Sequence, residues 1–330
     1  MNFMTPIDIN KCPEPIRYGQ KIMLTGSCFT EHIGNALSDL KFMVLQNPNG
    51  ILFDPNSVCK SLVSYTRNQQ YSEADLFYLN EIWNSWEHHS RFSNIDAAAA
   101  VKKINESQQQ AHAFLKEADW LIVTLGSSFS YRLTELAKNK TGEGVANCHR
   151  APGQWFTKHM QTIEETVTML DNTYHQLMHF NPKLRIIFTI SPVRHLRDGV
   201  VENNRSKARL LESVHHMVNK FDRLYYFPAY ELVIDVLRDY RFYDIDLAHP
   251  NYMATSFVLE KFTEACIDAD SQKLMEEVKK ISIAKRHKAF QPATEAHKQF
   301  LKTHAEKAKE LMEKYSFLDL SEELAYFTAS

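Results

Sequence analysis

Two short stretches carry the residue types that acyl-transfer chemistry needs. Ser27 follows a glycine after an apolar run, and Asp246 and His249 lie three residues apart before a helical pattern. A serine hydroxyl becomes a nucleophile when a histidine takes its proton, and a carboxylate on the other ring nitrogen orients that histidine. Taken alone, Ser27 is more often a helix cap, and Asp246 is more often a helix start beside a surface histidine. The chemistry therefore depends on whether the fold brings the two stretches together.

The elements around these residues predict an α/β fold with a parallel sheet. Apolar runs typical of buried strands alternate with segments of helical periodicity, an order that favours parallel pairing. The expected strands lie at 21–25, 42–46, 120–125, 184–193 and from 224 onward. The expected helices follow Ser27 and lie at 95–117, 160–179 and 203–220, with a polar loop at 138–150.

Polar and glycine-containing segments follow several of the expected strands. These segments are Gly26-Ser27, Asn47–Gly50, Gly126-Ser127 and Ser191–Arg194. In open parallel sheets, ligands bind beyond the carboxyl ends of the strands. The sequence therefore predicts a single site at that edge.

The composition changes near residue 270. From there the chain is rich in lysine and glutamate and contains no glycine, which indicates a helical extension. Its apolar residues need cover, so we expect it to pack on the preceding domain; they are Leu274, Ile281, Phe290, Phe300 and Leu301. We predict a catalytic domain at 1–268 and a packed extension at 269–330.

Composition and charge narrow the function classes. The 330 residues have a net charge of −2, which gives no reason to expect nucleic acid as a partner. The five cysteines include no CxxC pair, so neither a disulfide framework nor a structural zinc site is expected. The first residues lack the pattern of a signal peptide, and no apolar run is long enough for a membrane helix. We expect a cytoplasmic protein without a metal or cofactor, and the sequence indicates no particular oligomeric state.

Motifs spaced along the chain resemble those of the GSCFA family. The family's name spells its first motif, which here is GSCFT at 26–30. Further matching stretches are NPNGI at 47–51, SWEHHSRF at 85–92, NCH at 147–149, SPVRH at 191–195, ENNRSK at 202–207, and DYRFY at 239–243 leading into DLAHP at 246–250. The resemblance spans about residues 20 to 265. The family is similar to the SGNH/GDSL hydrolases, which implies a flavodoxin-like three-layer α/β/α sandwich.

This resemblance implies roles for the residues of the two opening stretches. Ser27 is the nucleophile, His249 is the general base and then the general acid, and Asp246 orients His249. The oxyanion hole takes backbone N–H groups from Ser27 or Cys28 and from Gly50.

The third block departs from the wider superfamily. There a Gly-x-Asn-Asp stretch carries an asparagine whose side chain completes the oxyanion hole, whereas this chain has Gly126-Ser127-Ser128-Phe129. The resemblance then implies that Ser127 or Ser128 donates instead, or that Asn147 reaches in from the next loop. Losing one oxyanion donor costs about 100- to 1000-fold in turnover.

Other reactive side chains have more than one interpretation. We expect the Cys28 side chain in the core, because free cysteine is usually buried. Adjacent histidines such as His88 and His89 rarely bind one ion, so a pocket role is favoured over a metal site. Arg194 is either a pocket residue or the ion-pair partner of Glu202 or a nearby aspartate. The residues expected to contact substrate are Asn47, Asn49, Trp86, His88, His89, His149, Arg194 and His195.

The sequence thus predicts an esterase or O-acyltransferase that forms an acyl-enzyme on Ser27. The substrate would be an ester of a small molecule, a carbohydrate or a lipid, and the acyl acceptor would be water or a hydroxyl group. The alternative is a non-catalytic ligand-binding or scaffold protein, in which segment 83–92 grips a ligand. The missing third-block asparagine favours that alternative.

Overall fold

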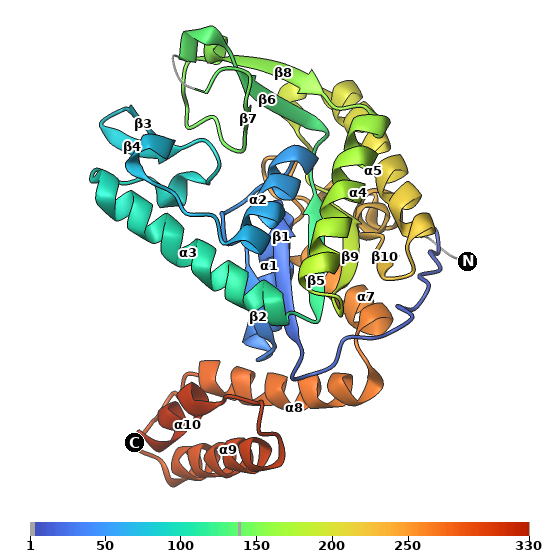
Figure 1. Ribbon diagram of the computed structural model, residues 1–330. Coiled ribbons are helices and arrows are strands. Elements are labelled where there is room, and N and C mark those ends of the chain that lie inside the picture. Colours follow the sequence, from blue (N-terminus) through green and yellow to red (C-terminus); the bar gives the residue numbers. More distant parts are fainter. Residues whose placement is uncertain (1–3, 138–139, 330) are drawn as a thin grey trace.

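A parallel five-stranded sheet forms the centre of the protein (Figure 1). The computed structural model describes residues 4–137 and 140–329. The strands of this sheet are β1 (Lys21–Gly26), β2 (Met43–Gln46), β5 (Trp120–Leu125), β9 (Arg185–Ile190) and β10 (Leu224–Tyr226). Their spatial order is β10-β9-β5-β1-β2. Counted along the chain within this sheet, that order is 2-1-3-4-5, the flavodoxin-like arrangement.

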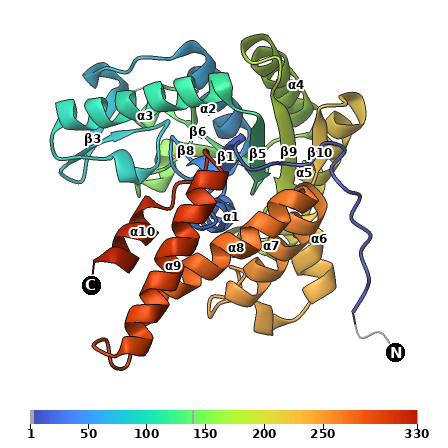
Figure 2. The same cartoon turned by 90° about the horizontal axis from the view of Figure 1, so that it is seen from below.

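Helices cover both faces of the sheet and complete a three-layer sandwich (Figures 1 and 2). One face carries α1 (Cys28–Asp39), α7 (Tyr252–Cys266) and a π-helical turn (Leu232–Leu237) that follows the short α6 (Ala229–Glu231). The other face carries α2 (Pro55–Arg67), α3 (Ala97–Glu117), α4 (Ile163–Phe180) and α5 (Val200–Lys220). The predicted α/β/α sandwich is confirmed.

The two hydrophobic clusters follow from the alternation of side chains along each strand. In β1, Ile22 and Leu24 join the cluster under α1 and α7, whereas Met23 joins the cluster under α2 to α5. All six residues of β5 are buried, as expected for a central strand covered on both faces. The apolar run predicted at 184–193 ends as a strand at Ile190, because Pro192 cannot donate to the ladder.

Two small antiparallel sheets lie over the carboxyl edge and were not predicted (Figure 1). One pairs β3 (Leu76–Leu79) with β4 (Ile82–Ser85), and the other pairs β6 (Phe129–Leu133) with β7 (Gly144–Val145) and β8 (Phe156–Met160). These strands are short and mix aromatic with polar residues, so they lack a clear period. Within the loop predicted at 138–150, residues 138–139 lie outside the described residues.

The C-terminal helices lie at the opposite end of the molecule from β6 to β8 (Figure 1). They are α8 (Ala269–Arg286), α9 (Glu295–Lys314) and α10 (Ser321–Thr328), and their buried residues belong to the same cluster as α1 and α7. Glu323 on α10 binds Lys41 at 3.0 Å, which joins the extension to the sandwich. Of the residues expected to need cover, Phe290 is 95% exposed and was wrongly assigned to the interface.

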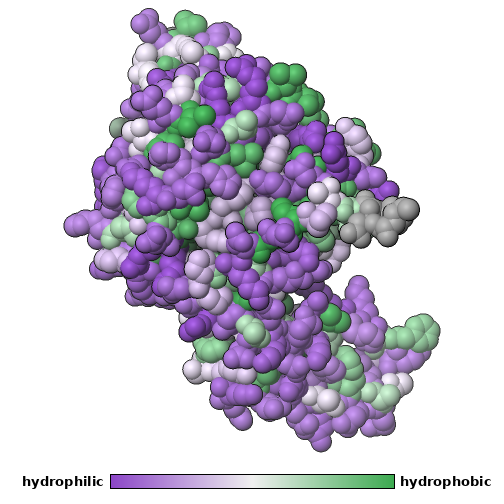
Figure 3. All heavy atoms as spheres, turned by 90° about the vertical axis from the view of Figure 1, so that its right-hand side faces the viewer, coloured by the Kyte–Doolittle hydropathy of each residue, from purple (hydrophilic) through white to green (hydrophobic). Residues whose placement is uncertain are grey.

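The surface gives no sign of a membrane-spanning element in the described ranges. No helix there combines the length and the apolar character needed to cross a bilayer. Figure 3 shows one face on which hydrophilic residues predominate and hydrophobic ones are scattered in small groups. Scattered groups of this kind are normal on protein surfaces.

Candidate active site

Ser27 lies between β1 and α1 at the carboxyl edge of the sheet. Gly26 before it has a φ of +144°, and a Cβ atom there would lie 2.2 Å from the Thr124 carbonyl oxygen. Glycine is required at this position, because it alone combines this backbone with so close an approach. The Ser27 N–H donates to the same Thr124 oxygen at 3.1 Å, which fixes the turn against β5.

The Ser27 side chain does not act as a helix cap. It stands at the N-cap position of α1, yet its hydroxyl makes no capping hydrogen bond. The residue is 3% exposed, and its hydroxyl oxygen has no hydrogen-bond partner among residues 4–137 and 140–329. An unpaired buried hydroxyl costs about 1–3 kcal/mol, so it calls for an explanation such as a catalytic role. The neighbouring Cys28 packs against the core, where burial raises the pKa of its thiol.

Asp246 and His249 form a hydrogen-bonded pair in the loop that precedes α7. The Asp246 carboxylate lies 2.6 Å from His249 Nδ1 and also accepts the N–H groups of Ala248 and His249, each at 3.0 Å. The His249 N–H, then that of Ala248, lower the pKa of Asp246 to about 2. Leu247 takes a left-handed conformation with φ +58°, which folds the loop back on itself. The carboxylate is therefore charged at neutral pH and fixes the orientation of the imidazole.

The loop after β9 connects this pair to the centre of the site. The Arg194 N–H donates to the Ala248 carbonyl at 3.2 Å, and the His195 N–H donates to Asn203 Oδ1 at 2.9 Å. A Cβ atom built on Gly126 would lie 3.4 Å from Ser27 Cβ and 3.5 Å from His195 Nε2. Ser27 and His195 therefore meet over the same glycine.

A buried lysine lies under this meeting point and was missed in the sequence. Lys207 on α5 is 1% exposed, and its Nζ donates to the Gly126 carbonyl at 2.5 Å and to the Ser191 carbonyl at 2.6 Å. It thereby ties the ends of β5 and β9 together, and burial lowers its pKa to about 7. The signal was a lysine at helical spacing between Asn203 and Leu210 on the buried face of α5.

Asn47 and Gly50 support the Ser27 turn from the next loop. Asn47 Oδ1 accepts the Gly26 N–H at 3.0 Å, so this predicted substrate residue holds the strand end through its side chain. Its carbonyl oxygen accepts the Gly50 N–H at 2.7 Å and a contact from Arg91. The Gly50 N–H, an expected oxyanion donor, is thus engaged within its own turn.

The serines of the third block are engaged elsewhere. Ser127 and Ser128 both place their hydroxyls against Ser206 Oγ, at 3.2 Å and 3.1 Å. The N–H groups of Gly126 and Ser127 donate to the Phe53 carbonyl. The other substitute, Asn147, accepts the His149 N–H with its side chain at 2.8 Å. These bonds hold the third block in place. The hydrogen bond that the missing asparagine would give to the oxyanion must therefore come from another group.

Three residues expected to contact substrate gather instead beneath the small sheets. Trp86 is buried and stacks on Phe77 with ring centroids 3.5 Å apart. His88 Nδ1 lies 2.8 Å from Ser85 Oγ, and His149 Nε2 lies 2.8 Å from the Ser85 carbonyl. Burial lowers the pKa of His88 to about 4. None of these contacts involves Ser27 within the described part of the chain, and the substrate role of the three residues stays a prediction.

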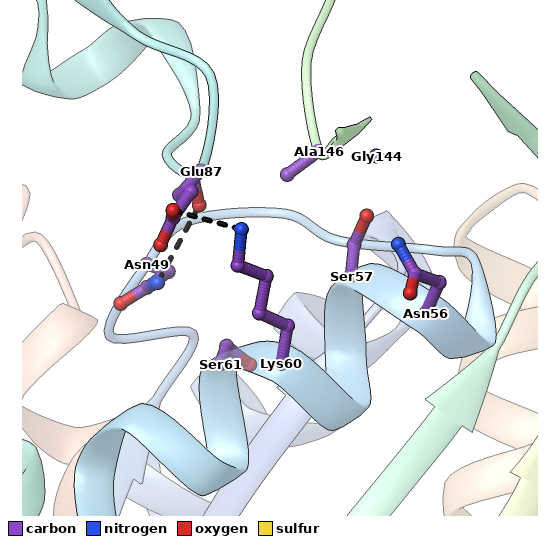
Figure 4. Close-up of a pocket in the computed structure, with 8 residues that line it drawn as sticks. All are labelled: Asn49, Asn56, Ser57, Lys60, Ser61, Glu87, Gly144 and Ala146. Atoms are coloured by element: carbon purple, nitrogen blue, oxygen red, sulfur yellow. Dashed lines mark hydrogen bonds and ion pairs between the residues drawn. The ribbon is translucent and has the colours of Figure 1, made fainter. Parts of the chain in front are cut away.

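Asn49 lines a small cavity of about 10 Å³ beside α2, as Figure 4 shows. Its side chain reaches the Glu87 carbonyl at 3.5 Å, and the Glu87 carboxylate pairs with Lys60 at 2.9 Å. That volume holds at most about one water molecule, so it is no substrate pocket. His89 lies on the other side of Asn49, because its N–H donates to the Asn49 carbonyl at 2.9 Å.

Arg194 has a different neighbour from the one the sequence suggested. Glu202 pairs with Arg205 at 2.8 Å, and no carboxylate partner of Arg194 is found in the described ranges. The Arg194 guanidinium lies 5.8 Å from the centre of the Tyr243 ring. Of the two alternatives for Arg194, the ion pair with Glu202 is not formed, and the guanidinium lies beside the Asp246–His249 loop.

The fold and this edge define an α/β/α sandwich with a serine after its first strand and an Asp–His pair before its last helix. A model of the GSCFA family matches residues 21–262, and one described as GSCFA domain protein, C-terminal domain, matches residues 278–330. The chain therefore belongs to the GSCFA family.

Among solved structures, the chain is similar to an acetyl xylan esterase (Est2A) from the rumen bacterium Butyrivibrio proteoclasticus. The two are 11% identical with a TM-score of 0.36, over 75% of this chain. This chain spans 63% of the length of that protein. No curated protein matches the sequence.

Proposed function

We propose that the protein is a serine-dependent esterase or O-acyltransferase that forms an acyl-enzyme on Ser27. The observation that carries the proposal is the pairing of two features at one sheet edge. One is a buried serine hydroxyl without a partner, and the other is a His249 imidazole oriented by a charged Asp246 at 2.6 Å. An oriented imidazole and a free hydroxyl are the two parts that nucleophilic acyl transfer requires.

The chemistry proceeds in two half-reactions. Ser27 Oγ attacks the ester carbonyl carbon while His249 takes the hydroxyl proton, and a tetrahedral oxyanion forms. The oxyanion collapses, the C–O bond to the alcohol breaks, and His249 returns the proton to that alcohol. Water or an acceptor hydroxyl then attacks the acyl-enzyme, with His249 again as base, and restores Ser27. Asp246 stabilises the imidazolium in both steps.

The resting side chains must move before the first step, because Ser27 Oγ has no partner and the side chain of His249 is 45% exposed. Catalytic hydrogen bonds are often open without substrate and tighten in the complex. The His249 loop is held by backbone bonds at both ends, with Asp244 N–H to the His249 carbonyl at 2.8 Å. A side-chain rotation on that fixed loop is the motion the proposal requires.

A non-catalytic ligand-binding protein is the second candidate. The observation that favours it is the closed Ser27 hydroxyl, which makes no bond to His249 in the resting state. A binding protein would keep the Asp246–His249 pair as a structural bond of its loop.

Labelling with a fluorophosphonate probe separates the two functions. We expect the wild-type protein to be modified at Ser27, and Ser27→Ala and His249→Ala to lose the modification. Ser64→Ala, which removes a buried hydroxyl on α2, and His216→Ala, which changes an exposed histidine on α5, serve as matched controls. A wild-type protein that resists the probe, or a Ser27→Ala variant labelled equally well, would overturn Ser27 as the nucleophile and favour the binding function.

A further inference from the structure

We propose that His195 is a catalytic residue that donates its Nε2–H to the oxyanion formed at Ser27. In this role it supplies the contact that an asparagine of the third block gives in the wider superfamily. The inference rests on the proposed function and adds a second imidazole with a task different from that of His249.

The position of His195 is the first support. Its Nε2 and the Ser27 Cβ both lie within van der Waals reach of a methyl group built on Gly126, at 3.5 Å and 3.4 Å. A carbonyl oxygen that enters over Gly126 would have Ser27 on one side and His195 on the other. A Cβ atom on Gly126 would also lie 2.9 Å from Phe53 Cβ, so glycine is needed here for the close approach of Phe53, Ser27 and His195.

The support of the imidazole is the second observation. Asn203, 2% exposed, accepts the backbone N–H of His195 and so holds the loop that carries the imidazole, and the Phe53 ring lies 5.2 Å from the His195 ring. The donors of the third block are already engaged, because the Ser127 and Ser128 hydroxyls bind Ser206 and the Gly126 N–H binds Phe53. His195 is thus held at the place where the block lacks a donor.

The charges around His195 favour a neutral donor. Burial, and next the Lys207 ammonium from α5, lower the pKa of His195 to about 4, and His249 and Lys158 act in the same direction. Asp198 opposes them. A neutral imidazole keeps one N–H for donation and does not compete with His249 for the serine proton. The same positive charges also stabilise negative charge that develops on the substrate oxygen.

Two variants of His195 and one control variant test the inference. His195→Leu removes the donor, His195→Gln replaces it with an amide N–H, and His216→Leu changes an exposed histidine as a control. Turnover of p-nitrophenyl acetate is measured from pH 5 to 9, after fluorophosphonate labelling of Ser27 has been established for the wild type. We expect His195→Leu to lower kcat about 100- to 1000-fold, as for other lost oxyanion donors, and His195→Gln to recover at least about a tenth of the activity. The pH at which activity rises should be the same in all variants, because His195 is not the group that takes the serine proton.

A crystal structure of the protein phosphonylated at Ser27 gives an independent measurement. We expect His195 Nε2 at about 2.7–3.2 Å from a phosphonyl oxygen, the range of a hydrogen bond. This measurement shows whether His195 is the oxyanion donor even if His195→Leu folds poorly or the wild type turns over too slowly.

The outcomes distinguish this inference from the proposed function. If Ser27 labels normally but His195→Leu turns over like the wild type, or if Leu and Gln lose activity equally, His195 is not the donor. A shifted pH profile in His195→Gln would make His195 a base and would also overturn the inference. If the wild-type Ser27 does not label at all, the proposed function itself fails.

Discussion

The carboxyl edge of the sheet and the C-terminal extension are built by opposite rules. At the edge, the Ser27 hydroxyl is buried without a partner, and Lys207 and Asp54 are ionisable groups removed from water. In the extension, α8 and α9 begin with side-chain caps at Asp268 and Thr294, and their outer faces carry lysine–glutamate pairs one turn apart. The edge therefore holds polar groups without charged partners, whereas the buried Glu323 of the extension is paired with Lys41 and Lys285.

We interpret this difference as the one between a region suited to chemistry and a region suited to packing. Unpaired hydroxyls and desolvated charges each cost free energy, and they persist where a function uses them. Regular caps and amphipathic faces are what stable helices need and carry no reactivity of their own. The predictions below test whether the edge residues exchange stability for activity and whether the extension residues do neither.

The largest effect is expected for Asp246→Asn. The change keeps the size of the side chain but removes the charge that selects the Nδ1–H form of His249, so turnover should fall about 10,000-fold. Unfolding by urea should be nearly unchanged, because the side chain is 48% exposed. Asp239→Asn, an exposed helix-capping aspartate in the preceding segment, is the control and should retain activity. Equal losses in both variants would assign Asp246 a purely structural role.

Lys207 gives the largest expected change in stability. Lys207→Ala leaves the Gly126 and Ser191 carbonyls without their donor and opens a cavity, so the free energy of unfolding should fall by about 3 kcal/mol. Lys207→Met keeps the volume of the side chain, so its free energy of unfolding should fall less than that of Lys207→Ala. Lys220→Ala, an exposed change on the same helix, should lose almost nothing.

The pH dependence of stability gives a second measurement on Lys207. Its folded pKa of about 7 lies below the unfolded value of 10.5, so the unfolded state binds the extra proton between these values. Stability contributed by this group should therefore rise as the pH increases from about 7 to 10.5. Lys207→Met should lack this rise when its urea midpoints are compared with those of the wild type. Parallel pH curves for the two proteins would show that the lysine does not titrate in this range.

For Asp54, the pH dependence of the free energy of unfolding should have the opposite sign from that of Lys207. It caps α2 by accepting the Ser57 N–H at 3.0 Å, and burial raises its pKa to about 6, above the unfolded value of 3.8. Stability is therefore lost as the pH rises from about 3.8 to 6, because the unfolded state releases its proton first. Asp54→Asn keeps a capping oxygen and should gain on the order of 2 kcal/mol at pH 7.5 but nothing near pH 3. Asp96→Asn, the same change at the exposed cap of α3, should leave the free energy of unfolding unchanged at both pH values.

The smallest effect is expected on the outer face of α9. Lys298→Ala removes an exposed pair with Glu295 at 2.7 Å, and such pairs contribute little in water. The urea midpoint and the turnover should both match the wild type within error. A clear loss of activity would mean that this face takes part in function and would contradict the contrast with the carboxyl edge.

The layered fold could be predicted because it depends on local patterns. Buried strands such as 120–125 are continuous apolar runs, and helices such as α5 keep an apolar face at regular spacing. The small sheets could not be predicted in this way, because β7 has two residues and its pairing with β6 depends on the chain that folds back over the edge.

The site was predictable only in part for a related reason. The Asp246–His249 bond joins residues three apart, so a motif captures it. The meeting of His195 with Ser27 over Gly126, and the bonds from Lys207 to two strand ends, join residues far apart in sequence. The substrate role of Trp86, His88 and His149 was predicted from residue type and stays a prediction, because residue type alone does not distinguish a pocket wall from a buried aromatic cluster.

The closure of Ser27 has a consequence for how affinity is measured. If the open form makes up about 1% of the molecules at rest, every ligand of the open form binds about 100-fold more weakly than its contacts allow. A small activated ester would then show a high KM that reports the rarity of the open form and not a poor fit. Ligands with a second part that holds the open form would recover this affinity, so preference among substrates would follow their size beyond the ester as much as the acyl group.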